Sequence, residues 1–110
     1  MLYFLKVGKV SFMKSNLRNY LRSQAQSINP IVMVGKEGVG ESVVFALDQA
    51  LLHHELVKVK FQANKDHLKD LSAELATKTK SELISTIGFI TIFYRVSDEN
   101  LIEIPKSLLK

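Results

Sequence analysis

Three stretches of the chain have apolar residues at spacings of three and four, which is typical of helices with one buried side. The predicted helices cover residues 15–27, 41–54 and 66–78. In the first helix, the residues expected to face the core are Leu17, Leu21 and Ala25. The inward side of the second helix should consist of Val43, Val44, Leu47, Ala50, Leu51 and His54.

Other stretches have the features of β-strands. The predicted strands are 31–34, 56–61, 82–87 and 89–95, with a short edge strand at 101–104. Apolar and polar residues alternate in 56–61, which places Lys58 and Lys60 on the face opposite to the apolar side chains. Gly88 marks a tight turn or a bulge between the third and fourth strands. Tyr94, on the same face as the isoleucines of its strand, should be buried.

The predicted elements follow the order α-β-α-β-α-β-β. Alternation of helices and strands in 110 residues indicates one small α/β domain, which we expect to be a two-layer sandwich. The domain should cover residues 13–104, and a tail should cover 105–110. Residues 1–12 match a secretory signal poorly, and Met13 followed by Lys14 is typical of a natural start. Residues 1–12 are therefore expected to be an upstream extension or a sequence added for expression.

Charge is distributed unevenly along the chain. The formal net charge is +4, yet residues 1–30 contain five basic side chains and no acid, whereas the other 80 contain ten basic and eleven acidic side chains. Such an excess in one segment suggests a polyanionic partner, although a solvated helix face is the ordinary alternative. No apolar run reaches the roughly 18 to 20 residues that span a bilayer. The absence of cysteine excludes disulfides and thiolate chemistry.

Residues 35–42 read GKEGVGES and join the apolar run 31–34 to the second predicted helix. A glycine-rich turn at a helix start presents backbone N–H groups to an anion. The stretch departs from the nucleotide-binding pattern G-x-x-x-x-G-K-[ST], because Glu41 stands where the lysine is required. Two unit charges about 4 Å apart interact by roughly 4 kcal/mol at an effective dielectric constant near 20, and between Glu41 and a phosphate this interaction is repulsive. Nucleotide hydrolysis is therefore disfavoured. Two interpretations stay open: a site for a nucleic-acid backbone, or a plain turn without a ligand.

The remaining polar side chains indicate binding rather than catalysis. Lys14, Arg18 and Arg22 are four residues apart, so they form one basic stripe along the first helix. His53 and His54 diverge by about 100° on a helix and cannot easily share a metal ion. No spacing or motif supports a catalytic set. We predict no metal, no cofactor and no enzymatic activity.

Three segments, in this order and spacing, carry a family resemblance: PIVMVGKEGVGESV, HHELVKVKF and IGFITIFYR. Together with the basic helix before them, they resemble the CRM (chloroplast RNA splicing and ribosome maturation) domain, whose bacterial stand-alone version is the YhbY-like protein. The resemblance covers roughly residues 14–104. It implies a fold similar to the C-terminal domain of translation initiation factor 3, with a four-stranded mixed sheet and a G-x-x-G loop like that of KH domains.

The resemblance also implies a set of RNA-contacting residues on the loop, the basic helix and two strands. The set is Lys14, Arg18, Arg22, Gly35, Lys36, Glu37, Gly38, Lys58, Lys60 and Arg95. For Lys58 and Lys60 the alternative is the solvated face of an edge strand, where lysine opposes aggregation. Two positions depart from the family pattern. Many members have a capping Thr or Ser at Gly40, for which Ser42 is a substitute, and many have Lys or Arg at Phe89.

The function that the resemblance implies is that of a cytoplasmic, non-enzymatic RNA-binding protein acting on ribosomal RNA in precursors of the large subunit. We expect no membrane partner and no small-molecule substrate, and a monomer is favoured. Two alternatives remain. The first is a protein-interaction module on ribosomal particles that contacts little RNA, and the second is a domain that senses an anion or nucleotide.

Overall fold

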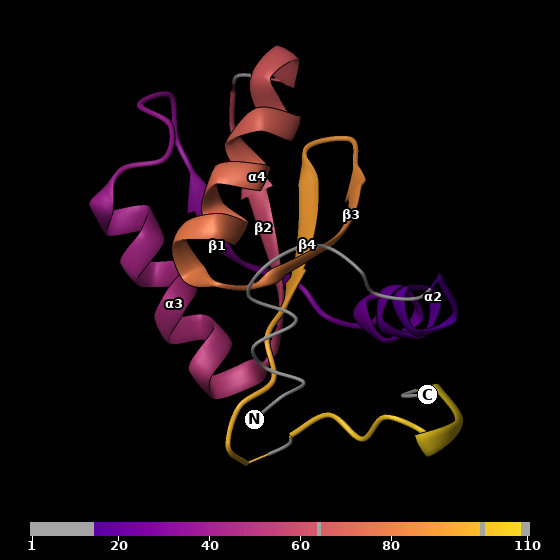
Figure 1. The fold of residues 1–110 in the computed structure, drawn as a ribbon. Coiled ribbons are helices and arrows are strands. Elements are labelled where there is room, and N and C mark those ends of the chain that lie inside the picture. The colour runs from indigo at the N-terminus through magenta and orange to yellow at the C-terminus, as the bar shows by residue number, and fades with distance from the viewer. Residues whose placement is uncertain (1–14, 64, 100, 109–110) are drawn as a thin grey trace.

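The computed structural model describes residues 15–63, 65–99 and 101–108, and its elements follow the predicted order (Figure 1). The helices are α2 (Ser15–Ala25), α3 (Glu41–His54) and α4 (Leu68–Thr79), with short 3-10 turns η1 (Lys65–His67) and η2 (Lys106–Leu108). The strands are β1 (Pro30–Val34), β2 (Leu56–Phe61), β3 (Glu82–Ile87) and β4 (Ile90–Tyr94). The predicted bounds of α3, β2 and β3 are confirmed, and the other elements differ at their ends by one or two residues.

The four strands form one mixed sheet, as predicted, and their order in the sheet is β1-β2-β4-β3. β1 and β2, which α3 connects along the chain, pair in parallel. β4 pairs antiparallel with both β2 and β3. Gly88 closes the β3–β4 hairpin at φ +59, a conformation that glycine adopts at little cost. Because β2 lies inside the sheet, the alternative that Lys58 and Lys60 belong to an edge strand is wrong.

Helices cover both faces of this sheet (Figure 1). Under α3 and α4 the core consists of Val32, Val34, Leu47, Leu51, Val57, Val59, Phe61, Leu68, Leu75 and Phe93. Under α2 a second cluster consists of Leu17, Leu21, Ala25, Leu56, Ile84, Ile92 and Tyr94. Successive side chains of a strand point to opposite faces, which is why Leu56 and Val57 belong to different clusters. The expected two-layer arrangement is therefore extended, since α2 adds a third layer over part of the second face.

The segment 101–104 is not a strand, so that prediction was wrong. Backbone–side-chain bonds hold it instead: the N–H of Ile102 donates to Glu55 at 2.9 Å, and the Tyr20 hydroxyl donates to the Glu103 carbonyl at 2.8 Å. Side chains from this tail, among them Ile102 and Ile104, pack against the α2 cluster. The tail thus completes the layer that α2 begins.

Burial within the elements mostly follows the sequence pattern. Tyr94 is 1% exposed, which confirms the prediction that it lies in the core. Leu47 and Leu51 form the buried side of α3. His54 is exposed, and its predicted inward position was wrong, because α3 ends there and the chain turns at Glu55 into β2. Within the described residues, no helix combines the length and apolar character required to cross a membrane.

Candidate nucleic-acid interface

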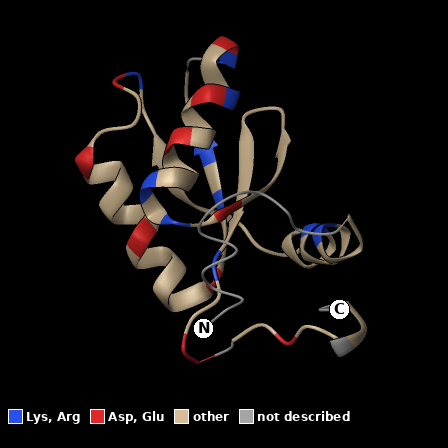
Figure 2. Cartoon of the chain, viewed as in Figure 1, with Lys and Arg blue, Asp and Glu red and all other residues tan. Residues whose placement is uncertain are grey.

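The residues between β1 and α3 form a tight, open turn. The N–H of Gly38 donates to the carbonyl of Gly35 at 3.1 Å, which leaves Lys36 and Glu37 at the tip, both exposed. Gly38 has φ +83, a conformation that side chains with a Cβ rarely adopt, so glycine is required here by the backbone. Figure 2 shows basic and acidic positions of the chain side by side at the tip of this loop. A Cβ at Gly38 would meet no atom within 4 Å, so this side of the turn is open to solvent.

The turn leads directly into the start of α3. The first helical bond runs from the N–H of Val44 to the carbonyl of Gly40 at 3.0 Å, so the N–H groups before Val44 have no acceptor within the helix. Gly40 occupies the cap position with extended backbone, and no side chain caps the helix. The prediction that Ser42 replaces the missing cap was therefore wrong. A helix start of this kind favours a negatively charged group.

Arg18 is half-buried against β3 rather than placed beside the loop. Its guanidinium donates to the carbonyls of Leu83 and Ile84 on β3 and pairs with Glu82 at 3.4 Å. β3 is the edge opposite to β1, so about three strand spacings of roughly 4.8 Å separate this contact from the strand that carries the loop. The structure does not bring Arg18 together with the glycine turn.

The other members of that stripe differ in position. Arg22 is exposed, and its guanidinium donates to Asn19 one helical turn away at 3.2 Å. Lys14 lies outside the described residues. Of the two described members of the stripe, Arg22 has its charge in solvent, whereas Arg18 binds α2 to β3.

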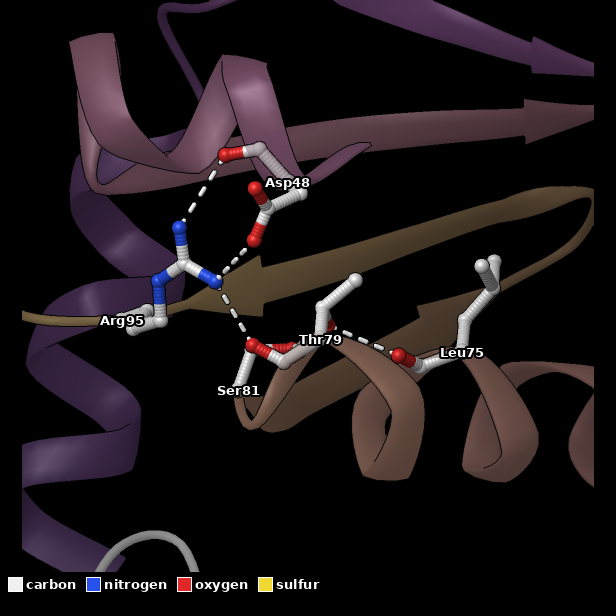
Figure 3. A network of polar contacts seen from close by, with 5 residues as sticks. All are labelled: Asp48, Leu75, Thr79, Ser81 and Arg95. Carbon is white, nitrogen blue, oxygen red and sulfur yellow. Dashed lines mark hydrogen bonds and ion pairs between the residues drawn. The ribbon is translucent and has the colours of Figure 1, made fainter. Parts of the chain in front are cut away.

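Arg95 also has an internal role that the sequence did not indicate (Figure 3). Its guanidinium donates to the Asp48 carboxylate at 2.8 Å, to the Asp48 carbonyl at 3.0 Å and to the Thr79 carbonyl at 2.6 Å. The Thr79 hydroxyl in turn donates to the Leu75 carbonyl and is also hydrogen-bonded to the Ser81 hydroxyl, which closes the end of α4. Only 10% of the Arg95 side chain is exposed. Arg95 therefore joins β4, α3 and α4 from within.

Lys58 and Lys60 lie on the α2 side of the sheet, because their neighbours Val57 and Val59 point into the core under α3, and β2 is an interior strand. Lys60 is exposed and Lys58 is half-buried. No ion pair involves either lysine within the described residues. Lys60 pairs in register with Met33, two residues before Gly35, so this lysine lies at the same end of the sheet as the glycine turn.

Glu55, which belongs to the family-like segment HHELVKVKF, is a buried anchor rather than a surface residue. It is 0% exposed and adopts φ +64 where α3 turns into β2. Burial raises the pKa of this carboxyl, but hydrogen bonds from the Ser97 hydroxyl and from the N–H groups of Ile102, Leu101 and Ser97 outweigh burial and leave the pKa below its ordinary value. The sequence offered no sign of these partners, which lie more than 40 residues away.

The described residues do not include a cluster of three or more His, Asp or Glu side chains placed to hold a metal.

The fold and the loop define a small α/β domain with an exposed glycine turn at a helix start. A family model, the CRS1/YhbY (CRM) domain, matches residues 13–95. The chain belongs to this family, and the resemblance seen in the sequence is confirmed.

Relatives and a solved structure agree with this assignment. The chain is 37% identical over 90 residues to an RNA-binding protein of Haemophilus influenzae, covering 81% of this chain and 91% of the relative. It is 38% identical over 90 residues to the "Probable RNA-binding protein YqeI" of Bacillus subtilis, covering 80% and 94%. The solution structure of SAV1595 from Staphylococcus aureus, a hypothetical protein described as a candidate for RNA binding, matches with a TM-score of 0.75 at 40% identity. That match covers 86% of this chain and all of the other.

These relatives carry the names of RNA-binding proteins and not of enzymes. The prediction of a non-enzymatic chain is confirmed at the level of the family. The match to SAV1595 also confirms the predicted fold class, a small α/β domain with a four-stranded mixed sheet.

Proposed function

We propose that the protein binds RNA through the Gly35–Gly38 turn, with the sugar-phosphate backbone against the start of α3. The observation that carries the proposal is the open turn itself. It places Lys36 at an exposed tip beside N–H groups that have no acceptor within the helix. Gly38 permits the close approach of a polynucleotide backbone, since a Cβ there would meet no protein atom within 4 Å. The names of the relatives support RNA as the ligand.

Within this proposal, the side chains that supply positive charge are Lys36, Lys58, Lys60 and Arg22. Arg18 and Arg95 instead hold elements of the fold together. Glu37 lies away from phosphates or meets a base edge. Lys14, outside the described residues, stays in the proposed set on sequence grounds alone.

The proposed RNA is ribosomal RNA in precursors of the large subunit, and the proposed compartment is the cytoplasm. Both follow from the resemblance to YhbY-like proteins. Binding should depend steeply on salt, because every neutralised phosphate releases counterions. If about five phosphates are neutralised, log affinity for single-stranded RNA should fall against log salt with a slope of about −3.5. A flat salt response of the purified protein with an RNA oligonucleotide would contradict the proposal.

A second candidate function, a protein-interaction module on ribosomal particles, is favoured by one observation. Phe45 is 66% exposed and Leu52 is 48% exposed, one above the other on the outer side of α3. Large apolar side chains in a row on a helix are frequent at protein contacts. Ribonuclease digestion separates the two functions: co-sedimentation with large-subunit particles that survives complete digestion would support the protein contact.

A further inference from the structure

The sheet has an apolar face that α2 leaves uncovered. We call it the open sheet face, and it consists of Ile31, Met33, Lys58, Lys60, Ile87 and Ile90. Val32 and Val34 point into the core under α3, so their neighbours Ile31 and Met33 point to the α2 side, where they are 54% and 46% exposed. Ile87 is 59% exposed.

The pairing of the strands aligns these residues into a row. Met33 pairs with Lys60, Lys60 pairs with Ile90, and Ile90 pairs with Ile87, so the row crosses all four strands. At about 4.8 Å between strands, its width is about 14 Å. α2 lies over the other end of the sheet, where Leu56 and Tyr94 pair. Large exposed apolar side chains gathered in this way on a small protein indicate a contact surface.

The row is continuous with the proposed RNA site and with a hollow beside it. Val34, the neighbour of Met33, is the last residue before the glycine turn, and its carbonyl accepts from the N–H of Gln62 at 2.8 Å. Toward α2, Ile31 and Lys58 line a hollow of about 480 Å³ together with residues such as Asn29 and Ile102. A chain that leaves the glycine turn can therefore cross the sheet without leaving the protein surface.

Charge on this face fits a polyanion. The four strands contain a single carboxylate, Glu82, and Arg18 pairs with it at 3.4 Å. Lys58 and Lys60 lie among apolar neighbours, with no ion pair in the described part of the chain. Duplex RNA presents phosphates and hydroxyls outward and would leave the isoleucines uncovered, whereas unpaired RNA offers both phosphates and the flat apolar surfaces of its bases.

We propose that the open sheet face, next to the glycine turn, holds a stretch of unpaired RNA. Phosphates lie at Lys58 and Lys60, and bases lie against Ile31, Met33 and Ile87. This inference rests on the RNA-binding function proposed above and adds the preference for single strands. The apolar residues supply that preference, because lysines alone attract paired and unpaired RNA alike.

The test compares an oligo(U) strand with a blunt RNA duplex of equal length, by fluorescence anisotropy in one buffer. The variant is Met33→Ser with Ile87→Ser. Its matched control is Leu52→Ser with Phe45→Ser, which removes similarly exposed apolar side chains from α3 on the opposite face. We expect the first variant to bind oligo(U) about tenfold more weakly, because it removes apolar area that the bases cover, and to bind the duplex as before. The control should bind both as the wild type does. Circular dichroism melts verify that both variants fold.

Unchanged oligo(U) affinity in the Met33 and Ile87 variant would overturn the inference and leave a protein as the occupant of this face. If Lys36→Asp still loses affinity in that case, the proposed function stands without the inference; if no variant loses affinity, both fail. Equal losses for strand and duplex would also overturn it, since the face would not distinguish bases. A dimer in sedimentation that the double variant dissociates would instead identify a second copy of the chain as the occupant.

Discussion

The guanidinium of Arg95 donates to the carboxylate of Asp48 at 2.8 Å and to the backbone carbonyl of the same residue at 3.0 Å. One side chain thus holds both the side chain and the backbone of a residue in the middle of α3. A third bond reaches the carbonyl of Thr79 at the end of α4. The position where β4 ends is therefore fixed against two helices at once (Figure 3).

Replacing Arg95 by lysine should destabilise the domain. An ammonium group lacks the planar fork that reaches these oxygens together, so we expect the free energy of unfolding to fall by about 2–3 kcal/mol. Urea denaturation measures the change. Arg22→Lys is the control, because Arg22 is exposed and its replacement should alter stability by less than about 0.5 kcal/mol. Similar values for the two variants would show that the Arg95 bonds contribute little.

Glu55 should make stability depend on acid pH. Because its hydrogen bonds outweigh the effect of burial and lower the pKa below the ordinary value of 4.5, the ionised carboxylate stabilises the fold above that pH. The contribution is lost as the pH falls through the lowered pKa of the folded state. Glu55→Gln should reduce the free energy of unfolding by about 1–3 kcal/mol at neutral pH and by less at about pH 3. Urea denaturation at both pH values tests this, and a difference between wild type and variant that stays constant would refute it.

Gly40 offers a site for stabilisation. It has φ −101 and ψ −175, the extended conformation of a helix cap, and a Cβ there would meet no atom within 4 Å. Gly40→Ser should therefore add a cap to α3 and raise the free energy of unfolding by about 0.5 kcal/mol. Gly40→Ala supplies the same Cβ without the hydroxyl. Thermal melts in which alanine stabilises as much as serine would rule out capping as the cause.

Reversing the charge at the tip of the glycine turn should weaken RNA binding without affecting the fold. Lys36→Asp should reduce affinity for an RNA oligonucleotide and make the salt dependence shallower, because fewer counterions are released. Its melting temperature should match that of the wild type, since the Lys36 side chain is exposed.

The control for this loop variant is Lys80→Asp, an equal change of charge at an exposed position just after the end of α4. It should leave affinity nearly unchanged. If Lys80→Asp weakens binding as much as the loop variant does, net charge rather than the glycine turn determines affinity.

Local patterns were sufficient to predict the elements and their order. The period of apolar residues located α3 between Glu41 and His54, and alternation located β2 between Leu56 and Phe61. Gly88 was predicted as a turn or bulge and closes the hairpin at φ +59. These features depend on neighbours in the chain, so the sequence contains them directly.

Features that depend on distant partners were not predicted. Apolar and polar residues alternate in β2, and the same alternation occurs in an edge strand and in an interior strand with one uncovered face. The sequence therefore did not decide whether Lys58 and Lys60 lie on an edge strand. Arg18 and Arg95 were predicted as surface cations because their acceptors lie 64 to 66 and 16 to 47 residues away, respectively. The predicted strand at 101–104 failed for the same reason, since Glu55 holds that segment from a distance.

The contact between Arg18 and β3 has a consequence for how copies of this protein behave at high concentration. β3 is an outer strand, and outer strands expose carbonyls to which a strand of another molecule can add. The guanidinium already occupies the carbonyls of Leu83 and Ile84, next to the register shift between Leu83 and Ser85. A neighbouring molecule would have to displace this cation before it could extend the sheet, so we expect Arg18 to oppose polymerisation along that edge.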